Sequence, residues 1–280
     1  MPETLLHCPL CTSLKFKKIV HRGKYGITEC VNCSLIFTNP RPTSDEIGDL
    51  YGKSYMANLE SVRPILFRIC ENRLLFVEKF KNGGRLLDVG CGNGYFLELA
   101  HRRGWEIFGT EISEYCIKYC KERFGISVHF GEIFEANFSD NYFDIITMWH
   151  TLEHVRNPIG YLRESNRILK NDGLLFILVP NARFLLSHLK GWAWIARSEI
   201  MEHLYFFSTD SLGSMLKKSN FKTIHKGIGN IESIRSCLKE KVIKVFSIAG
   251  RIFYFLSGIN IGDSIQVVAK KIDKRGRAPI

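Results

Sequence analysis

The sequence lacks an uninterrupted apolar run long enough to cross a membrane. Its most apolar late stretch, residues 242–261, contains Lys244 and Arg251, whereas a spanning helix needs ~20 predominantly apolar residues in succession. The N-terminus, Met-Pro-Glu-Thr-Leu-Leu-His-Cys, has neither the charged start nor the long apolar core of a signal peptide. We therefore expect a cytoplasmic protein.

A disulfide framework is also missing. The nine cysteines are an odd number, and four of them form two Cys-x-x-Cys pairs near the N-terminus, a spacing typical of metal ligation. With 45% apolar, 24% charged and 12% aromatic residues, the chain is neither disordered, collagen-like nor a pure coiled coil. Its 280 residues suit one domain of about 200 residues with a smaller module at one end.

Acidic residues are scarce, and their distribution is uneven. The chain has 28 Asp and Glu against 39 Lys and Arg, a net charge of +11. Residues 215–280 hold fourteen bases and four acids, but residues 86–214 hold twelve bases and sixteen acids. The basic C-terminal third is compatible with nucleic acid, with peripheral contact to an anionic membrane, or with a phosphorylated substrate, and a solvated cationic surface explains it equally well.

The two Cys-x-x-Cys pairs predict a structural zinc site. The eighteen residues between the pairs are enough for a short hairpin that brings both turns to one ion. Four thiolates close the tetrahedral shell and leave no position for water, and metal binding would fold a segment too short for its own core. The predicted ligands are Cys8, Cys11, Cys30 and Cys33. Free thiols or an incidental disulfide are the alternative, and His7 and His21 are further ligand candidates.

A bridge connects this module to the rest of the chain. Residues 35–42 predict a short strand ended by Pro40 and Pro42, and a helix start follows at residues 43–46. Residues 59–80 carry apolar side chains at helical spacing, and Asn-Gly-Gly then ends the helix. We predict a zinc module over residues 1–42, a helical linker over 43–82 and a main domain over 83–280.

The main domain begins with a glycine-rich turn. Residues 85–96 read Arg-Leu-Leu-Asp-Val-Gly-Cys-Gly-Asn-Gly-Tyr-Phe, an apolar strand, a turn and the start of a helix. Glycines allow the backbone to approach a ligand closely and to take positive φ angles, and the helix N-terminus offers free amides. The next strand, residues 106–111, ends in Glu111, which is positioned to bind ribose hydroxyls. A nucleotide cofactor is indicated.

Asp88 followed by Gly-x-Gly-x-Gly closely resembles motif I of class I S-adenosylmethionine-dependent methyltransferases, whereas dehydrogenases usually carry Gly-x-Gly-x-x-Gly. The resemblance runs from Gly84 to about Pro180. It implies an α/β fold, with a Rossmann-like seven-stranded methyltransferase sheet, helices on both faces and the small N-terminal zinc knuckle. Later strands are expected at residues 142–146, 173–180, 221–227 and 264–270.

The resemblance also implies the cofactor-binding residues. Asp88 would serve the methionine end of S-adenosylmethionine and Glu111 the ribose. Glu132, at the adenine position, replaces the aspartate more often seen there. Cys91 is expected to be passive and selected for its small size. The implied set is Asp88, Gly90, Cys91, Gly92, Gly94, Glu111, Ile112 and Glu132.

Methyl transfer requires chiefly an aligned nucleophile and a base, because the sulfonium already makes the methyl group electrophilic. One candidate cluster is Trp-His-Thr-Leu-Glu-His at residues 149–154. It matches an inverted zinc-protease pattern, which we reject because it lies where methyltransferases commonly carry Leu-Glu-His-Val. Similarity to ubiquinone-pathway O-methyltransferases implies a divalent-cation role for His150, Glu153 and His154. Two alternatives stay open: Glu153 and His154 brace the cofactor loop, or His154 removes the proton.

A second cluster, Glu-His-Leu-Tyr-Phe-Phe-Ser at residues 202–208, resembles a segment of sugar C-methyltransferases that carry an N-terminal zinc module. This resemblance places Glu202, His203 and Tyr205 on the substrate side, with His203 as the base and His154 competing from the opposite side of the cleft. Those enzymes have a further large C-terminal domain, for which this chain is too short, and this departure argues against sugar C-methylation. A hydrogen-bonded loop anchor is the alternative role for residues 202–203.

The last third predicts a helix at residues 210–218, the two final strands and a helical insertion at about 231–262. Residues 238–256 are amphipathic and would pack as a lid or core element, cover a hydrophobic substrate or rest on anionic lipid. Residues 270–277 predict a solvated tail.

The sequence favours an S-adenosylmethionine-dependent methyltransferase acting on a small molecule or a glycan or sugar intermediate. A zinc-knuckle ribosomal RNA methyltransferase is the alternative, although no aromatic and basic stacking platform is evident. A cofactor-binding scaffold without catalysis is the third class.

Overall fold

The computed structural model describes residues 1–48, 63–183, 191–192, 200–229 and 264–272. The predicted insertion at 231–262, the first residues of the predicted helix at 59–80 and most of the predicted tail lie outside these ranges. Among the described residues, no helix is both long and apolar enough to span a bilayer.

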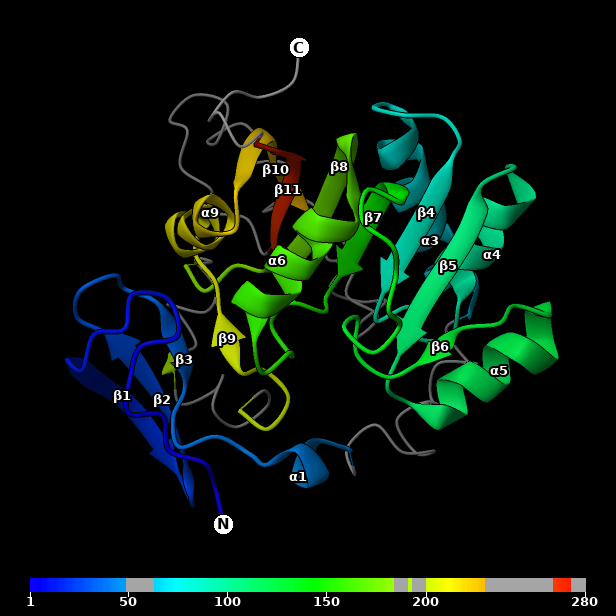
Figure 1. Ribbon diagram of the computed structural model, residues 1–280. Coiled ribbons are helices and arrows are strands. Elements are labelled where there is room, and N and C mark those ends of the chain that lie inside the picture. Colours follow the sequence, from blue (N-terminus) through cyan, green and yellow to red (C-terminus); the bar gives the residue numbers. More distant parts are fainter. Residues whose placement is uncertain (49–62, 184–190, 193–199, 230–263, 273–280) are drawn as a thin grey trace.

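A four-stranded sheet forms the N-terminal module. Strands β1 (Phe16–Arg22) and β2 (Tyr25–Cys30) make the antiparallel hairpin expected between the two cysteine pairs, and β3 (Ile36–Thr38) pairs with β2. The fourth strand, β9 (Tyr205–Phe206), comes from far along the chain and pairs with β3 (Figure 1). The sheet therefore extends beyond the predicted module boundary at residue 42. Helix α1 (Ser44–Gly48) follows β3.

The main sheet has the seven strands that were predicted. Their order is β10 (Phe221–Gly229), β11 (Ser264–Lys271), β8 (Leu169–Pro180), β7 (Phe143–Trp149), β4 (Arg85–Val89), β5 (Glu106–Glu111) and β6 (His129–Phe130). The five strands from β8 to β6 are parallel, and β11 is antiparallel to both of its neighbours. The chain runs outward from β4 to β6 in one direction and from β7 to β8 in the other. This reversal places a topological switch point between β4 and β7, where open α/β sheets bind ligands.

Helices cover both faces of this sheet (Figure 1). On one face lie α3 (Arg63–Glu78), α4 (Tyr95–Arg102) and α5 (Glu114–Phe124), and on the other lie α6 (Pro158–Ile168) and α9 (Thr209–Lys218). The central strands are apolar on both sides because both faces are buried. In β8, Phe176 belongs to the core under α3 and α4, whereas Ile177 belongs to the core under α6 and α9. The second core also contains Cys8 and Phe37, so the N-terminal module shares it.

Candidate active site

The glycine-rich turn after β4 has the backbone conformation that the sequence predicts. Gly90, Gly92 and Gly94 have φ angles of 70°, 54° and 74°, a region that side chains other than glycine rarely occupy. A Cβ at Gly90 would lie 2.8 Å from Thr151, and one at Gly94 would lie 2.7 Å from the Cys120 sulfur. A Cβ at Gly92 would meet nothing within 4 Å. Side chains therefore pack closely against the turn at Gly90 and Gly94, whereas the space beside Gly92 is open.

Glu111, the last residue of β5, lies beside this turn. Its Oε2 accepts a hydrogen bond of 2.8 Å from the Gly92 amide, and its Oε1 accepts bonds of 2.8 and 2.9 Å from the amides of Ile112 and Ser113. A carboxylate has about four acceptor positions, so this side chain is held in place with acceptor capacity left on Oε2. It lies at the edge of the sheet where open α/β sheets bind ligands.

Asp88 lies under the turn, on the strand end. Only 3% of the residue is exposed, and its Oδ1 accepts a 2.6 Å hydrogen bond from the Thr147 hydroxyl. Burial raises the pKa of this carboxyl to about 7, although the Thr147 bond and the nearby Arg73 charge act in the opposite direction. The protein thus keeps an acid with a strongly perturbed pKa at its switch point, which is a common property of functional sites.

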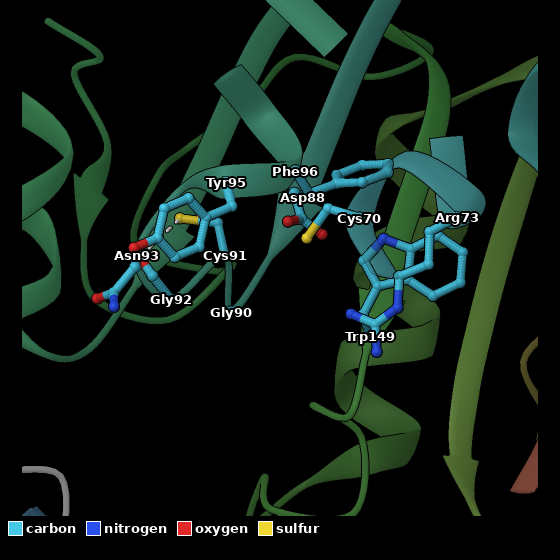
Figure 2. A pocket seen from close by; sticks show the side chains of 10 residues that line it. All are labelled: Cys70, Arg73, Asp88, Gly90, Cys91, Gly92, Asn93, Tyr95, Phe96 and Trp149. Carbon is cyan, nitrogen blue, oxygen red and sulfur yellow. Dashed lines mark hydrogen bonds between the residues drawn. The ribbon is translucent and has the colours of Figure 1, made fainter. Parts of the chain in front are cut away.

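A cavity of about 170 Å³ opens between α3, the glycine turn and the end of β7 (Figure 2). It is lined by Cys70, Arg73, Asp88, Gly90, Cys91, Gly92, Asn93, Tyr95, Phe96 and Trp149. The Arg73 guanidinium lies over the Trp149 ring, 5.3 Å from its centroid. Two buried wall atoms, Asn93 Oδ1 and Trp149 Nε1, have no hydrogen-bond partner in the described chain. Buried polar atoms are normally paired, so the cavity wall is suited to a polar ligand.

The contribution of α3 to this cavity was not predicted. Residues 59–80 were interpreted as part of a linker, but α3 packs on α4, and the Phe67 and Tyr95 rings lie 4.8 Å apart. This contact places Arg73 beside Asp88. Helix α3 carries Arg63, Arg68 and Arg73 among its apolar residues, and nothing in the local sequence indicates which of these cations reaches the glycine turn.

The remaining predicted cofactor residues lie at the same end of the sheet. Ile112 is 49% exposed next to Glu111. Glu132 follows β6, and burial together with the Glu135 charge raises its pKa. The pKa of the Cys91 thiol is raised, first by its hydrogen bond with Cys120 and then by burial, which agrees with a passive role for this residue.

The segment after β7 carries a buried carboxylate between histidines. Glu153 is 1% exposed, its Oε1 lies 3.2 Å from His150 Nδ1, and its Oε2 has no partner in the described chain. Burial opposes ionisation of Glu153, but its hydrogen bond with His150 and the other histidines around it outweigh burial, so its pKa is lowered. The ionised form of this carboxyl is therefore favoured.

The two candidate bases lie together, contrary to the prediction that they face each other across the cleft. The His154 and His203 ring centroids are 4.8 Å apart, because the chain segment 202–205 packs directly against the segment after β7. His154 Nδ1 donates a 2.9 Å hydrogen bond to the Glu202 carbonyl, which leaves Nε2 without a proton in the neutral ring. Burial lowers the pKa of His154 to about 4, so this ring is neutral at ordinary pH.

The structure also changes the set of side chains that could hold a metal at this place. Glu153, His154 and His203 each offer a ligand atom within 4.8 Å of the others, so His203 stands in this group in place of the His150 that the resemblance implied. Tyr205, like His154 and His203, is not among the residues that line the cavity. It is 2% exposed within β9, and its hydroxyl donates to the Arg156 carbonyl at 3.1 Å. The carbonyls of Glu202 and His203 accept hydrogen bonds from His154 and Thr38, so the segment 202–203 has anchoring contacts.

The four N-terminal cysteines converge as predicted. The sulfurs of Cys8 and Cys33 are 3.5 Å apart, those of Cys11 and Cys30 are 3.4 Å apart, and all four lie within 4.8 Å of one another. Zinc–sulfur bonds of ~2.3 Å in a tetrahedron require sulfur separations of about 3.8 Å. The arrangement therefore fits one zinc ion. Within the described residues, neither His7 nor His21 joins this group.

Comparison with known proteins agrees with the fold. The family of methyltransferase domains matches residues 65–226. The chain belongs to this methyltransferase family. The matched range begins within α3.

The chain has low sequence identity with several proteins that are named methyltransferases. It is 32% identical over 123 residues to a ubiquinone biosynthesis O-methyltransferase of Actinobacillus pleuropneumoniae serotype 5b, covering 39% of this chain and 52% of that protein. It is 25% identical over 166 residues to the Ruegeria pomeroyi protein of the same name, covering 55% and 66%. The chain thus spans about half to two thirds of the length of these relatives.

A methyltransferase of Archaeoglobus fulgidus described as SAM-dependent superposes with a TM-score of 0.54 at 24% identity, over 72% of this chain and 93% of that one. One from Methanosarcina mazei, described in the same way, superposes with a TM-score of 0.52 at 17% identity, over 70% and 96%. These likenesses show the methyltransferase fold.

Proposed function

We propose that the protein transfers a methyl group from S-adenosylmethionine to a hydroxyl group of a small molecule, a glycan intermediate being one such acceptor. The observation that carries this proposal is the cavity at the switch point, where Asp88, the glycine turn and Arg73 meet and Glu111 lies beside the turn. Membership of the methyltransferase family supports the reaction class. The relatives named O-methyltransferases support a small-molecule hydroxyl as acceptor.

The cavity wall matches the groups of this cofactor, which supplies an electrophilic methyl group on a sulfonium sulfur. Asp88 and Asn93 Oδ1 are acceptors for an ammonium group, and Arg73 and Trp149 Nε1 are donors for a carboxylate. The free acceptor position on Glu111 suits ribose hydroxyls. The exposed Ile112 and the half-buried Glu132 lie farther along the same edge, where they would meet the adenine.

The histidine pair supplies the base in this proposal. His203 removes the proton of the acceptor hydroxyl, and His154 holds the neighbouring position with its Nδ1 proton committed to the Glu202 carbonyl. The buried Glu153 carboxylate beside them stabilises the positive charge that a histidine gains when it takes a proton.

Glu111→Ala should weaken S-adenosylmethionine binding by roughly 5- to 150-fold, because a lost partner of a buried polar group costs about 1 to 3 kcal/mol. The variant also removes the acceptor of the Gly92 amide. Isothermal titration calorimetry measures the dissociation constant. Glu114→Ala makes the same charge change at an exposed position on α5 and should bind like the parent. Unchanged affinity in Glu111→Ala would remove Glu111 from the site.

Arg73→Met should weaken S-adenosylmethionine binding about 10- to 150-fold, the range expected for a hydrogen bond between charged groups. Binding of methylthioadenosine, which lacks the amino-acid carboxylate, should be unaffected. Arg68→Met changes the same charge at an exposed position of α3 and serves as the control. Equal loss of both ligands in Arg73→Met would show that Arg73 supports the cavity rather than binding a carboxylate.

A radiolabel screen tests the acceptor class. Purified protein and methyl-labelled S-adenosylmethionine are incubated with phenols and catechols, nucleotide sugars, lipid-linked glycans or ribosomal RNA. We expect label in a small hydroxyl compound or a glycan intermediate. Label confined to RNA would overturn the proposed acceptor in favour of the RNA methyltransferase alternative, while leaving the reaction class intact.

A further inference from the structure

We propose that the four-cysteine module is a positioning part of the active site, in which metal bound to the cysteines fixes the place of His203 through β3 and the Thr38 hydroxyl. The inference rests on the proposed function for its catalytic meaning, but its structural content is independent of methyl transfer. It assigns the module a role in the chemistry of a site to which none of its cysteines belongs.

The first step is the bond between Thr38 and the His203 segment. Thr38 is fully buried at the end of β3. Its hydroxyl donates a 2.7 Å hydrogen bond to the His203 carbonyl, and its amide donates a 3.0 Å bond to the Leu204 carbonyl. The ladder continues as Phe37 pairs with Tyr205 and Ile36 with Phe206. The module therefore holds four consecutive residues, 203–206, by main-chain and hydroxyl contacts.

The second step is the other side of the same segment. The Leu204 and Tyr205 amides both donate to the Glu153 carbonyl, at 2.9 and 3.1 Å, and the His154 ring donates to the Glu202 carbonyl. The segment 202–206 is thus held between β3 and the chain that follows β7. The 4.8 Å separation of the His154 and His203 rings depends on both sets of bonds.

The third step connects β3 to the metal site. Cys30 is the last residue of β2, and β3 begins three residues after Cys33. The turn between them is closed by the Cys30 amide on the Leu35 carbonyl and by the Ser34 amide on the Cys30 carbonyl, both at 2.9 Å. The metal ligands therefore set the turn that brings β3 into register with β2. Small modules of this kind depend on their metal for folding.

This chain of contacts leads to a different expected exchange pattern from that of a module that folds on its own. If the metal keeps β3 in register, its removal should speed hydrogen exchange at the amides of residues 203–206 as well as at those of the module. The glycine turn at residues 89–94 lies on the main sheet and should be unaffected. An autonomous module would lose protection over residues 1–42 alone.

Hydrogen–deuterium exchange on the full chain tests this, with protein as purified, after treatment with a zinc chelator, and as the Cys8→Ser/Cys33→Ser variant. Metal analysis should give about one zinc per chain before treatment. We expect at least tenfold faster exchange at residues 203–206 without metal, and unchanged exchange at 89–94. The proposal would be overturned if metal removal speeds exchange at residues 1–42 alone. It would also be overturned if the purified protein holds no metal.

Substitution of Thr38 tests the same coupling without disturbing the metal. Thr38→Val should raise exchange at residues 203–206 about tenfold, because the segment loses the bond that holds it against β3 and opens more often, and Thr38→Ser should restore protection. Thr28→Val is the matched control: Thr28 is also buried in the module, and its hydroxyl donates to the Asn39 carbonyl at 3.2 Å, away from His203. Equal effects of the Thr28 and Thr38 variants, or no rescue by serine, would contradict the proposal.

A separate measurement distinguishes failure of this inference from failure of the proposed function. Calorimetry with S-adenosylmethionine on the same samples reports the cofactor site directly, and Thr38→Val should bind the cofactor as the parent does. Loss of cofactor binding in Thr38→Val would contradict the specific positioning of His203 and indicate general damage to the fold. Absence of binding in the parent protein would reject the proposed function and leave the exchange result standing.

Discussion

Asp88→Asn is expected to stabilise the ligand-free protein at pH 8 and, at the same time, to weaken its binding of S-adenosylmethionine. The Asp88 carboxyl is buried, and burial raises its pKa from the ordinary 3.8 to about 7. A group whose pKa is higher in the folded protein contributes its full stability below its unfolded pKa and loses that stability as the pH rises through its folded pKa. At pH 8 the folded protein therefore carries a buried anion at a cost on the order of 4 kcal/mol at most.

An asparagine at this position avoids that cost. Its amide oxygen can still accept the hydrogen bond of Thr147, which is buried on β7. Urea denaturation at pH 5 and pH 8 measures the free energy of unfolding. We expect the gain of Asp88→Asn over the parent to be larger at pH 8 than at pH 5, because less of the parent's Asp88 is ionised in the folded state at pH 5.

Cofactor affinity should change in the opposite direction. The parent should bind S-adenosylmethionine more tightly as the pH rises through about 7, since the ionised carboxylate is the form that pairs with an ammonium group. Asp88→Asn should bind at least tenfold more weakly at pH 8 and lose the contribution of this carboxyl to the pH dependence. Asp210→Asn, at a side chain that is 81% exposed, should change neither quantity appreciably. A loss of stability at pH 8 in Asp88→Asn would contradict this account.

His203→Ala is expected to lower the rate of methyl transfer roughly 100-fold or more while leaving cofactor affinity nearly intact, as is usual for loss of a positioned base. His203 is the better candidate of the pair. The pKa of His154 is lowered to about 4 by burial, which makes its ring a weak proton acceptor. His154→Ala should also reduce turnover, because it removes the ring that packs on His203 and bonds the Glu202 carbonyl.

Single-turnover kinetics with the acceptor identified in the screen measures this rate. If the histidines act together, the double variant should be little worse than His203→Ala alone, since residues that form one unit are not additive. His225→Ala changes a histidine of β10 that contacts Phe76 and Phe80 and serves as a control. Normal turnover in His203→Ala would eliminate it as the base, and the rate of His154→Ala would then decide whether its neighbour has that role.

Much of the fold was predictable because it depends on local patterns. Residues 173–180 lie in a strand because an apolar run that follows a glycine favours a buried parallel strand, and residues 106–111 form the next strand after the turn at Gly104. The turn at Gly90, Gly92 and Gly94 takes positive φ angles that the glycines themselves indicated. Because the carboxyl ends of parallel strands meet at one edge, the positions of Asp88 and Glu111 at that edge also followed from the sequence.

The remaining parts of the site depend on contacts between distant segments. Thr38 and His203 are 165 residues apart in the chain, and β9 is a two-residue strand whose apolar sequence carries no sign of its partner. The neighbouring positions of His154 and His203 follow from that pairing. Arg73 reaches the cavity because α3 packs on α4.

The sequence alone therefore determined the glycine turn with its acidic neighbours and the four converging cysteines, since backbone preference and ligand spacing act over a few residues. The seven-stranded sheet followed from the resemblance of these motifs to class I methyltransferases. Tertiary structure alone decided which helix lies over the turn, which strand completes the N-terminal sheet and which histidine faces His154. These arrangements are set by the burial of apolar side chains from distant segments in shared cores, and such burial is non-directional and leaves no fixed spacing in the sequence.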